Sequence, residues 1–144
     1  MPLYKYTTTV EALQTVSEIQ RILVNHGARS ILMDYGKDGS VEALAFKVMT
    51  LHGEVAIRLP VNADAVLKVL ERECVPRRYT NKAQAVRVAW RILKEWVAAQ
   101  MAIIETEMVT MDEVFLPYVL TSSGKTVYEL AIDRGFKELG SRNE

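Results

Sequence analysis

Bulky apolar residues and small or polar residues alternate along the middle of the chain. The alternation runs through residues 41–50 and again through residues 54–59. Since neighbouring side chains of a strand point to opposite faces, both stretches predict strands with one bulky face and one small-residue face. Residues 29–35 predict a third strand. The connections at residues 36–39 and 52–53 are short enough to require antiparallel hairpins, so the three strands are expected to form a meander. We also expect a helix of this chain or a partner subunit to lie across the small-residue face.

The N-terminal residues predict a further strand and a first helix. Residues 3–10 are rich in Thr and Tyr, which favour strands, and they would extend the sheet to four strands. Residues 15–18, Thr-Val-Ser-Glu, have the spacing of a capping box, and apolar residues follow at helical intervals. Gly27 is expected to end this helix.

The longest predicted element is a helix over about residues 81–107 with two apolar seams side by side. One seam contains Trp90 and Val97, and the other contains Ala89 and Trp96. Two seams need two partners. We therefore expect the helix to be central in its fold or to pack on another copy of the chain, and we favour a homodimer or higher oligomer.

Shorter helices are predicted on either side of the long one. A helix is expected over about residues 62–73, and capping boxes at residues 110–113 and 126–129 predict two more. The predicted fold is thus α+β, with an antiparallel three- to four-stranded meander flanked by helices. We expect one domain over residues 1–139 and a flexible tail over residues 140–144.

Composition agrees with an ordinary globular domain. The chain has 144 residues, of which 49% are hydrophobic, and only 7 Gly and 4 Pro, which argues against a disordered or collagen-like chain. No apolar run approaches the roughly 18 residues that cross a bilayer, so no membrane partner is expected. A single cysteine cannot form an internal disulfide and no export signal is visible, so we expect a cytoplasmic protein.

Few residues could support catalysis or bind a metal. Two His and one Cys do not make a zinc or iron site, so neither a metal nor a cofactor is expected. The segment Ser122–Thr126 ends like a phosphate-binding loop, but that pattern requires Gly at position 119, where this chain has Val. A turn leading into a capped helix is the better interpretation. Helix capping accounts for Asp112 and Glu113. We therefore do not expect an enzyme.

Charge is unevenly distributed, although the net charge is zero. Residues 77–94 contain six basic and no acidic residues, and residues 95–121 contain five acidic and no basic residues. Guanidinium groups bind phosphate oxygens in pairs and aromatic rings stack on bases, so the basic block suits a nucleotide or a nucleic acid. The alternative is that these bases are solvated, or pair with the acidic block of a neighbouring copy. The candidate ligand-binding residues are Arg58, Arg77, Arg78, Tyr79, Lys82, Arg87, Arg91 and Lys94.

Several segments resemble those of a group of small uncharacterised proteins encoded in phages, prophages and other mobile elements of bacteria. The segments are His26–Ala28, Arg58–Pro60, Arg87–Lys94 and Glu113–Tyr118. No functional residue is carried over from the group. The resemblance implies a setting in which a small binder blunts host defence, for instance by sequestering a cyclic nucleotide or ADP-ribose-type signal. A second setting is recombination, since helix, three-strand meander, helix is also the order in double-stranded-RNA-binding domains and in annealing proteins.

These features lead to three hypotheses about function. The first is a non-catalytic oligomeric protein whose pocket binds an anionic, nucleotide-like ligand against the basic block. The second is a nucleic-acid-binding accessory protein of phage recombination that uses the same bases as a surface track. The third is a protein–protein inhibitor of a host defence complex, in which the long helix or the acidic residues 105–113 contact the target.

Overall fold

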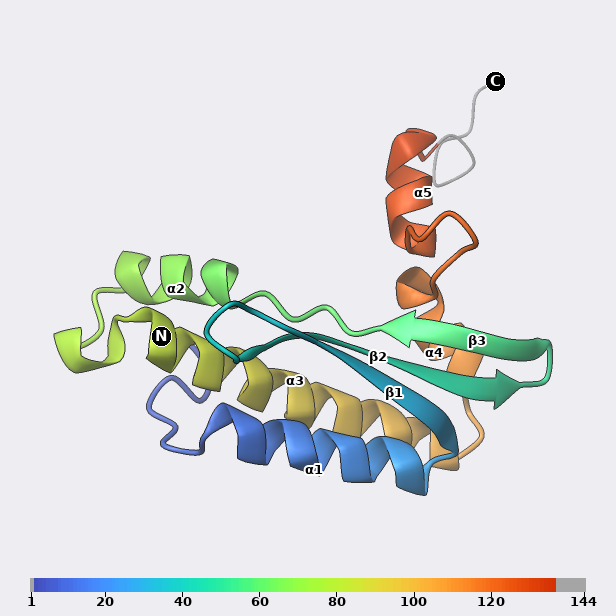
Figure 1. Cartoon of the computed structure of the whole chain (residues 1–144), viewed down its shortest axis with the longest axis horizontal. Helices are drawn as coiled ribbons and strands as arrows, with labels where there is room; N and C mark the ends of the chain where they lie inside the picture. The colour runs from blue at the N-terminus through green and yellow to red at the C-terminus, as the bar shows by residue number, and fades with distance from the viewer. Residues whose placement is uncertain (1, 137–144) are drawn as a thin grey trace.

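The computed structural model describes residues 2–136 of the chain. This part has an α+β fold with a three-stranded antiparallel sheet and five α-helices (Figure 1). The sheet is the predicted meander, in the order β1 (Ala28–Tyr35), β2 (Val41–Thr50) and β3 (Gly53–Arg58). The tail predicted over residues 140–144 lies outside the described residues.

Most of the helices begin where the sequence predicts. The N-cap side chains of Asn62 and Asn81 accept hydrogen bonds from the backbone at the starts of α2 and α3. The capping boxes predicted at residues 110–113 and 126–129 are present, at α4 and α5, and the segment before α5 is a turn, as expected. The helical elements are α1 (Ala12–Asn25), α2 (Ala63–Arg72), α3 (Lys82–Glu105), α4 (Met111–Phe115), α5 (Val127–Asp133) and two 3-10 turns, η1 (Arg77–Tyr79) and η2 (Leu116–Tyr118).

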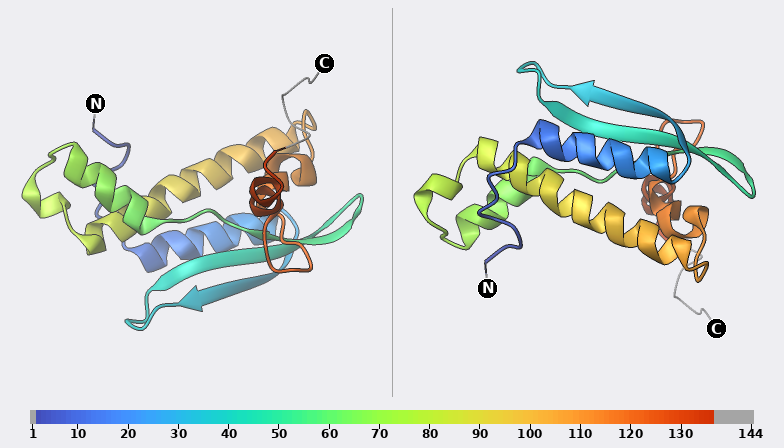
Figure 2. Two further views of the ribbon diagram at one scale, coloured as in Figure 1. Left: turned by 90° about the horizontal axis from the view of Figure 1, so that it is seen from above. Right: turned by 90° about the horizontal axis from the view of Figure 1, so that it is seen from below.

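Helices α1 and α3 lie side by side on the bulky face of the sheet (Figure 2). Phe46 and Ile57 from the sheet are fully buried against Ile19 of α1 and Trp90 of α3. Removing this apolar surface from water is the main stabilising term of the fold. The side-chain alternation of β2 and β3 therefore predicted the correct buried face.

The two apolar seams of α3 both find partners within the chain. The seam with Trp90 and Val97 packs into the core with α1 and the sheet. On the second seam Ala89 is buried, and α2 packs against the N-terminal half of α3 (Figure 1). Trp96, further along this seam, meets the rings of Phe115 and Tyr118 edge-on at 5.6 Å each. The seams thus do not by themselves require a second copy.

The strand predicted over residues 3–10 is wrong. Residues 4–7 form turns, and Lys5 has a positive φ of 63°. The segment is held at the junction of α2 and α3, where Gln84 donates hydrogen bonds from its side-chain amide to the carbonyls of Tyr6 (2.8 Å) and Thr8 (2.9 Å). A side chain therefore satisfies these two carbonyls, and turn hydrogen bonds from Tyr6 to Leu3 and from Thr8 to Lys5 replace the pairing with a neighbouring strand.

The capping box predicted at residues 15–18 is also wrong. α1 begins one turn earlier, with Glu11 as its N-cap, and the Thr15 hydroxyl donates to the Glu11 carbonyl inside the helix. Glu18 instead pairs with a base on α3. The end of α1 is as predicted, because Gly27 has a φ of 98°, a conformation that favours glycine.

The small-residue face of the sheet lies opposite the side that α1 and α3 cover. Arg58 on this face reaches Glu129 of α5, while Leu32 in the same cross-strand row is 66% exposed. Figure 1 shows α5 projecting from the body beyond β3. Coverage of this face by a partner subunit stays a prediction.

Candidate functional site

The candidate ligand-binding residues lie in three separate parts of the structure. Arg77, Arg78 and Tyr79 form η1, at the junction between α2 and α3, and Lys82 opens α3. The later bases of the block lie along α3 where it faces α1. Arg58 ends β3 and pairs with α5. The structure therefore does not bring all eight residues together around one ligand.

The bases along α3 are already paired with carboxylates of α1. Arg91 donates to Glu18 at 3.0 Å and to the Thr15 hydroxyl at 3.4 Å. Burial alone would raise the pKa of Glu18, but the hydrogen bond and charge of Arg91, together with Gln14 and Lys94, outweigh it, so the pKa is lowered. Lys94 lies 3.8 Å from the same carboxylate, and Arg87 lies 3.8 Å from Glu11. These bases clamp α1 to α3.

Two other candidates are paired as well. Lys82 forms an ion pair with Asp64 at the start of α2, and Arg58 donates to Glu129 at 3.1 Å. Within residues 2–136, five of the seven candidate cations thus have a carboxylate partner in the same chain. The exceptions are Arg77 and Arg78. Because the partners are supplied mostly by α1, α2 and α5, the acidic block of another copy is not needed for this pairing.

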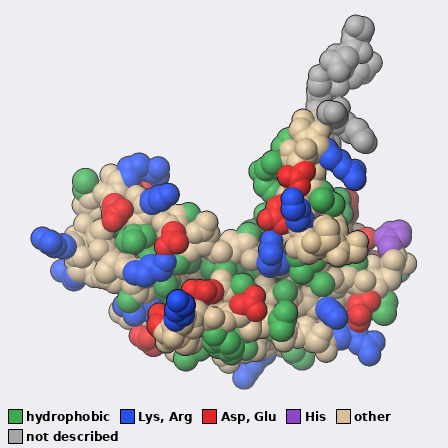
Figure 3. All heavy atoms as spheres, turned by 45° about the horizontal axis from the view of Figure 1, so that its top comes forward, with side chains coloured by type: hydrophobic (Ala, Val, Ile, Leu, Met, Phe, Trp, Pro, Cys, Tyr) green, Lys and Arg blue, Asp and Glu red, His purple; other side chains and the backbone are tan. Residues whose placement is uncertain are grey.

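Five of the ten Lys and Arg residues that form no ion pair within residues 2–136 lie at one end of the molecule, around α2 and η1. The other five lie elsewhere and are Arg21, Arg29, Lys37, Lys47 and Arg134. Figure 3 shows several Lys and Arg side chains on the lobe around α2 and η1, with Asp and Glu side chains between them. Lys68 and Arg72 are four residues apart on α2, so they share a helix face beside η1. We call this surface the basic lobe; its members are exposed and form no ion pair within residues 2–136, and they are Lys5, Lys68, Arg72, Arg77 and Arg78.

Tyr79 packs against residues of the basic lobe and of the N-terminal segment. Its ring meets Tyr6 edge-on at 5.4 Å, and the guanidinium of Arg78 lies 4.8 Å from its centre. The hydrogen bond and charge of Tyr79 raise the pKa of Arg78 above its ordinary value. Tyr79 therefore positions Arg78, and its ring is less open for stacking on a base than the sequence suggested.

A hollow of about 300 Å³ lies next to the basic lobe and contains Lys82 and Trp90 in its lining. Glu42 and Asp64 line the same hollow. Two carboxylates oppose an anion electrostatically, and Lys82 is already paired with one of them. This hollow is therefore poorly suited to a phosphate.

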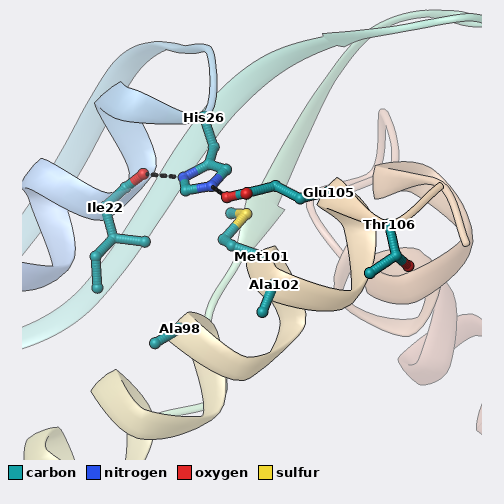
Figure 4. Close-up of a pocket in the computed structure, with 7 residues that line it drawn as sticks. All are labelled: Ile22, His26, Ala98, Met101, Ala102, Glu105 and Thr106. Carbon is teal, nitrogen blue, oxygen red and sulfur yellow. Dashed lines mark hydrogen bonds and ion pairs between the residues drawn. The ribbon is translucent and has the colours of Figure 1, made fainter. Parts of the chain in front are cut away.

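Another hollow opens between α1 and α3, at the ends of both helices (Figure 4). His26 lies in it with one ring nitrogen 2.8 Å from the Ile22 carbonyl and the other 2.5 Å from Glu105. The hydrogen bond to Glu105, aided by that to Ile22, raises the pKa of His26 above 6.5. A cationic ring at the end of α1 is also favoured by the helix dipole.

We expect replacement of His26 by Gln to destabilise the protein more at low pH than at high pH. Because the pKa of His26 is raised by folding, its contribution is complete below 6.5 and is lost as the pH rises through the folded-state value. Urea unfolding at about pH 5.5 and about pH 8.5 measures how much free energy of unfolding the variant has lost relative to the unaltered protein. We expect this loss to be about 0.5–1 kcal/mol at the lower pH and smaller at the higher pH. An equal deficit at both pH values would contradict this assignment.

Two further observations bear on the class of protein. Among the described residues, no group of three or more His, Cys, Asp and Glu side chains could hold a metal ion. No helix within residues 2–136 combines the length and apolar character that a bilayer crossing requires. Comparisons of the chain with protein-family models, with curated proteins and with solved structures gave no match.

Proposed function

We propose that this protein is a non-catalytic nucleic-acid-binding protein that contacts the phosphate backbone through its basic lobe. The observation that carries this proposal is the location of its unpaired cations. The bases along α3 have partners, whereas those of α2 and η1 are exposed and have none within residues 2–136. Because exposed cations can each neutralise one phosphate, they suit a backbone more than a buried pocket.

The shape of the lobe favours a track over a pocket. Arg77 and Arg78 are exposed on a 3-10 turn between two helices, and the nearby hollow is lined by carboxylates. The helix, meander, helix order of α1, the sheet and α3 adds an analogy to nucleic-acid-binding folds, although α2 is inserted before α3. Sequestration of a small nucleotide stays a prediction with less support from this geometry.

We expect the protein to bind oligonucleotides with an affinity that increases with length and falls steeply with salt. If about four lobe cations each contact a phosphate, a plot of log K against log salt for single-stranded DNA should have a slope of about −3. Fluorescence anisotropy with labelled single-stranded and duplex DNA and RNA of several lengths would measure this slope. Thermal shift with mononucleotides and dinucleotides provides the competing test.

The outcomes separate the hypotheses. A large rise in melting temperature with one small nucleotide, and no dependence on oligonucleotide length, would favour the pocket. If the protein binds neither oligonucleotides nor small nucleotides, the hypotheses of nucleic-acid binding and of nucleotide binding are both contradicted.

The hypothesis of a protein–protein inhibitor has one separate observation in its favour. A hollow of about 550 Å³ at the tip of the β2–β3 hairpin is lined by Met49, Leu51 and Met111, with Glu107 and Asp112 beside them. Methionine side chains adapt to varied apolar partners, and the acidic residues would suit a basic one. If the protein binds neither oligonucleotides nor nucleotides, the protein–protein inhibitor is the hypothesis that remains, with this hollow as its binding site.

A further inference from the structure

The two edges of the sheet differ in how the chain covers them. Along β3, Val119 forms a bridge to Ile57, and Leu120 donates a backbone hydrogen bond to Ala56 at 2.8 Å. Along β1, no further strand or bridge is present within residues 2–136, since β1 pairs with β2 alone. An open edge presents backbone donors and acceptors that another strand can use.

The centre of this edge is not protected by charge, proline or a bulge, the devices that proteins commonly use to blunt an open edge. β1 contains neither lysine nor proline, and its charged residues Arg29 and Asp34 and its two pairing irregularities lie toward its ends. Instead, Leu32 at its centre is 66% exposed and Tyr35 at its end is 58% exposed. Pairing with β2 is regular from Ser30 to Asp34 and irregular on both sides of that stretch. The usable edge is therefore a regularly paired segment of five residues with Leu32 in the middle.

We propose that a second copy of this chain pairs with β1 in the antiparallel sense, with Leu32 opposite Leu32 of the other copy. The two sheets then form one continuous sheet of six strands around a two-fold axis. Residues opposite each other in such a pair lie on the same face, so the axis must pass through a residue position. With the axis at Leu32, all five residues of the regular stretch from Ser30 to Asp34 can pair with the second copy.

This register makes the strand complementary to itself. Ser30 lies opposite Asp34 of the second copy, so its hydroxyl can donate to that carboxylate, and Ile31 lies opposite Met33 on the core side. Arg29 is the extra residue at the irregularity between Ala28 and Ser30, so it lies at the same end of the interface as Asp34 of the second copy. Neither Arg29 nor Asp34 forms an ion pair within residues 2–136. Each charged pair occurs twice in the dimer because of the two-fold symmetry.

The neighbouring face of α1 continues the interface. The side-chain amide of Gln20 lies 3.8 Å from the sulfur of Met33, which places this side of α1 next to β1. Leu13 and Val24 are seven residues before and four residues after Gln20, so they share its side of the helix. Both are more than half exposed. An apolar patch that extends from the strand to the helix favours a second copy over a lone added strand, which would leave Leu13 and Val24 uncovered.

The first test is the oligomeric state of the full chain and of Leu32→Lys. Light scattering at micromolar concentrations should give twice the chain mass of 16.3 kDa for the unaltered protein. In Leu32→Lys two like charges face each other at the axis, so we expect the dimer dissociation constant to rise at least about tenfold. The control is Leu51→Lys at the tip of the β2–β3 hairpin, where the side chain is 89% exposed and the dimer should persist. Circular dichroism checks that both variants fold.

The second test measures the register directly. Cys74 is exposed, so it is first replaced by Ser. In this background Leu32→Cys should form a disulfide-linked dimer under mild oxidation, whereas Leu51→Cys should not. A monomer at all concentrations, a dimer that Leu32→Lys leaves intact, or cross-linking equal at both positions would each overturn the proposal. None of these readouts requires a nucleic acid, so the dimer and the proposed function can fail independently.

Discussion

Replacement of Phe115 by Ala is expected to lower the free energy of unfolding by about 3–5 kcal/mol. Phe115 is completely buried and joins three parts of the fold. Its ring meets Phe46 of β2 edge-on at 5.8 Å and Trp96 of α3 at 5.6 Å. Alanine removes these contacts and leaves a cavity that the rigid sheet and α3 cannot close. Urea unfolding followed by circular dichroism measures the loss.

The adjacent residue provides a matched control. Leu116 follows Phe115 directly but is 52% exposed, so Leu116→Ala should change the free energy of unfolding by less than about 0.5 kcal/mol. Equal losses for the two variants would mean that Phe115 does not anchor α4 to the core. A small loss for Phe115→Ala would contradict the packing of the aromatic cluster.

The sheet and the later helices could be predicted because their signals are local. Alternation of apolar residues selects the buried face of a strand, and the short turns leave only an antiparallel order. Each of the capping boxes at Thr110 and Thr126 closes within three residues, and both form. None of these features depends on contacts with distant parts of the chain.

The N-terminal segment was mispredicted because distant contacts decide its conformation. Strand propensity favoured residues 3–10, but Gln84 satisfies their carbonyls from 76 or more positions away. Likewise, Thr15 and Glu18 have the spacing of a capping box, yet Glu18 forms an ion pair with Arg91, which lies 73 positions further along the chain. A local motif cannot reveal that a distant charge will compete for the same carboxylate.

The same limitation affected the candidate site. A block of six bases without an acid suggests mutual repulsion, but folding brings Glu11 and Glu18 of α1 against its second half. The predicted site also left out Lys68 and Arg72. The acidic residues Glu71 and Glu73 separate them from the uninterrupted run of bases that begins at Arg77. The four-residue spacing of Lys68 and Arg72 on a predicted helix was the signal that could have added them.

Replacing both Arg77 and Arg78 by Ala is expected to weaken oligonucleotide binding about 10- to 100-fold at moderate salt. Each arginine supplies a charge-assisted contact to a phosphate, and two such contacts are lost. The slope of log K against log salt for single-stranded DNA should become less steep by about 1.4, since each lost contact removes about 0.7. Because phosphate contacts carry no sequence information, the loss should be similar for all oligonucleotide sequences.

The matched control removes two positive charges elsewhere. Arg21 on α1 and Lys37 in the β1–β2 turn are exposed and form no ion pair within residues 2–136, so Arg21→Ala with Lys37→Ala changes the net charge equally. If the basic lobe binds the backbone, this control should retain most of the affinity and the full salt slope. Equal losses in the two double variants would show that binding follows net charge alone. Such a result would remove the basic lobe as the site, because long-range attraction and not local contact would then account for the affinity.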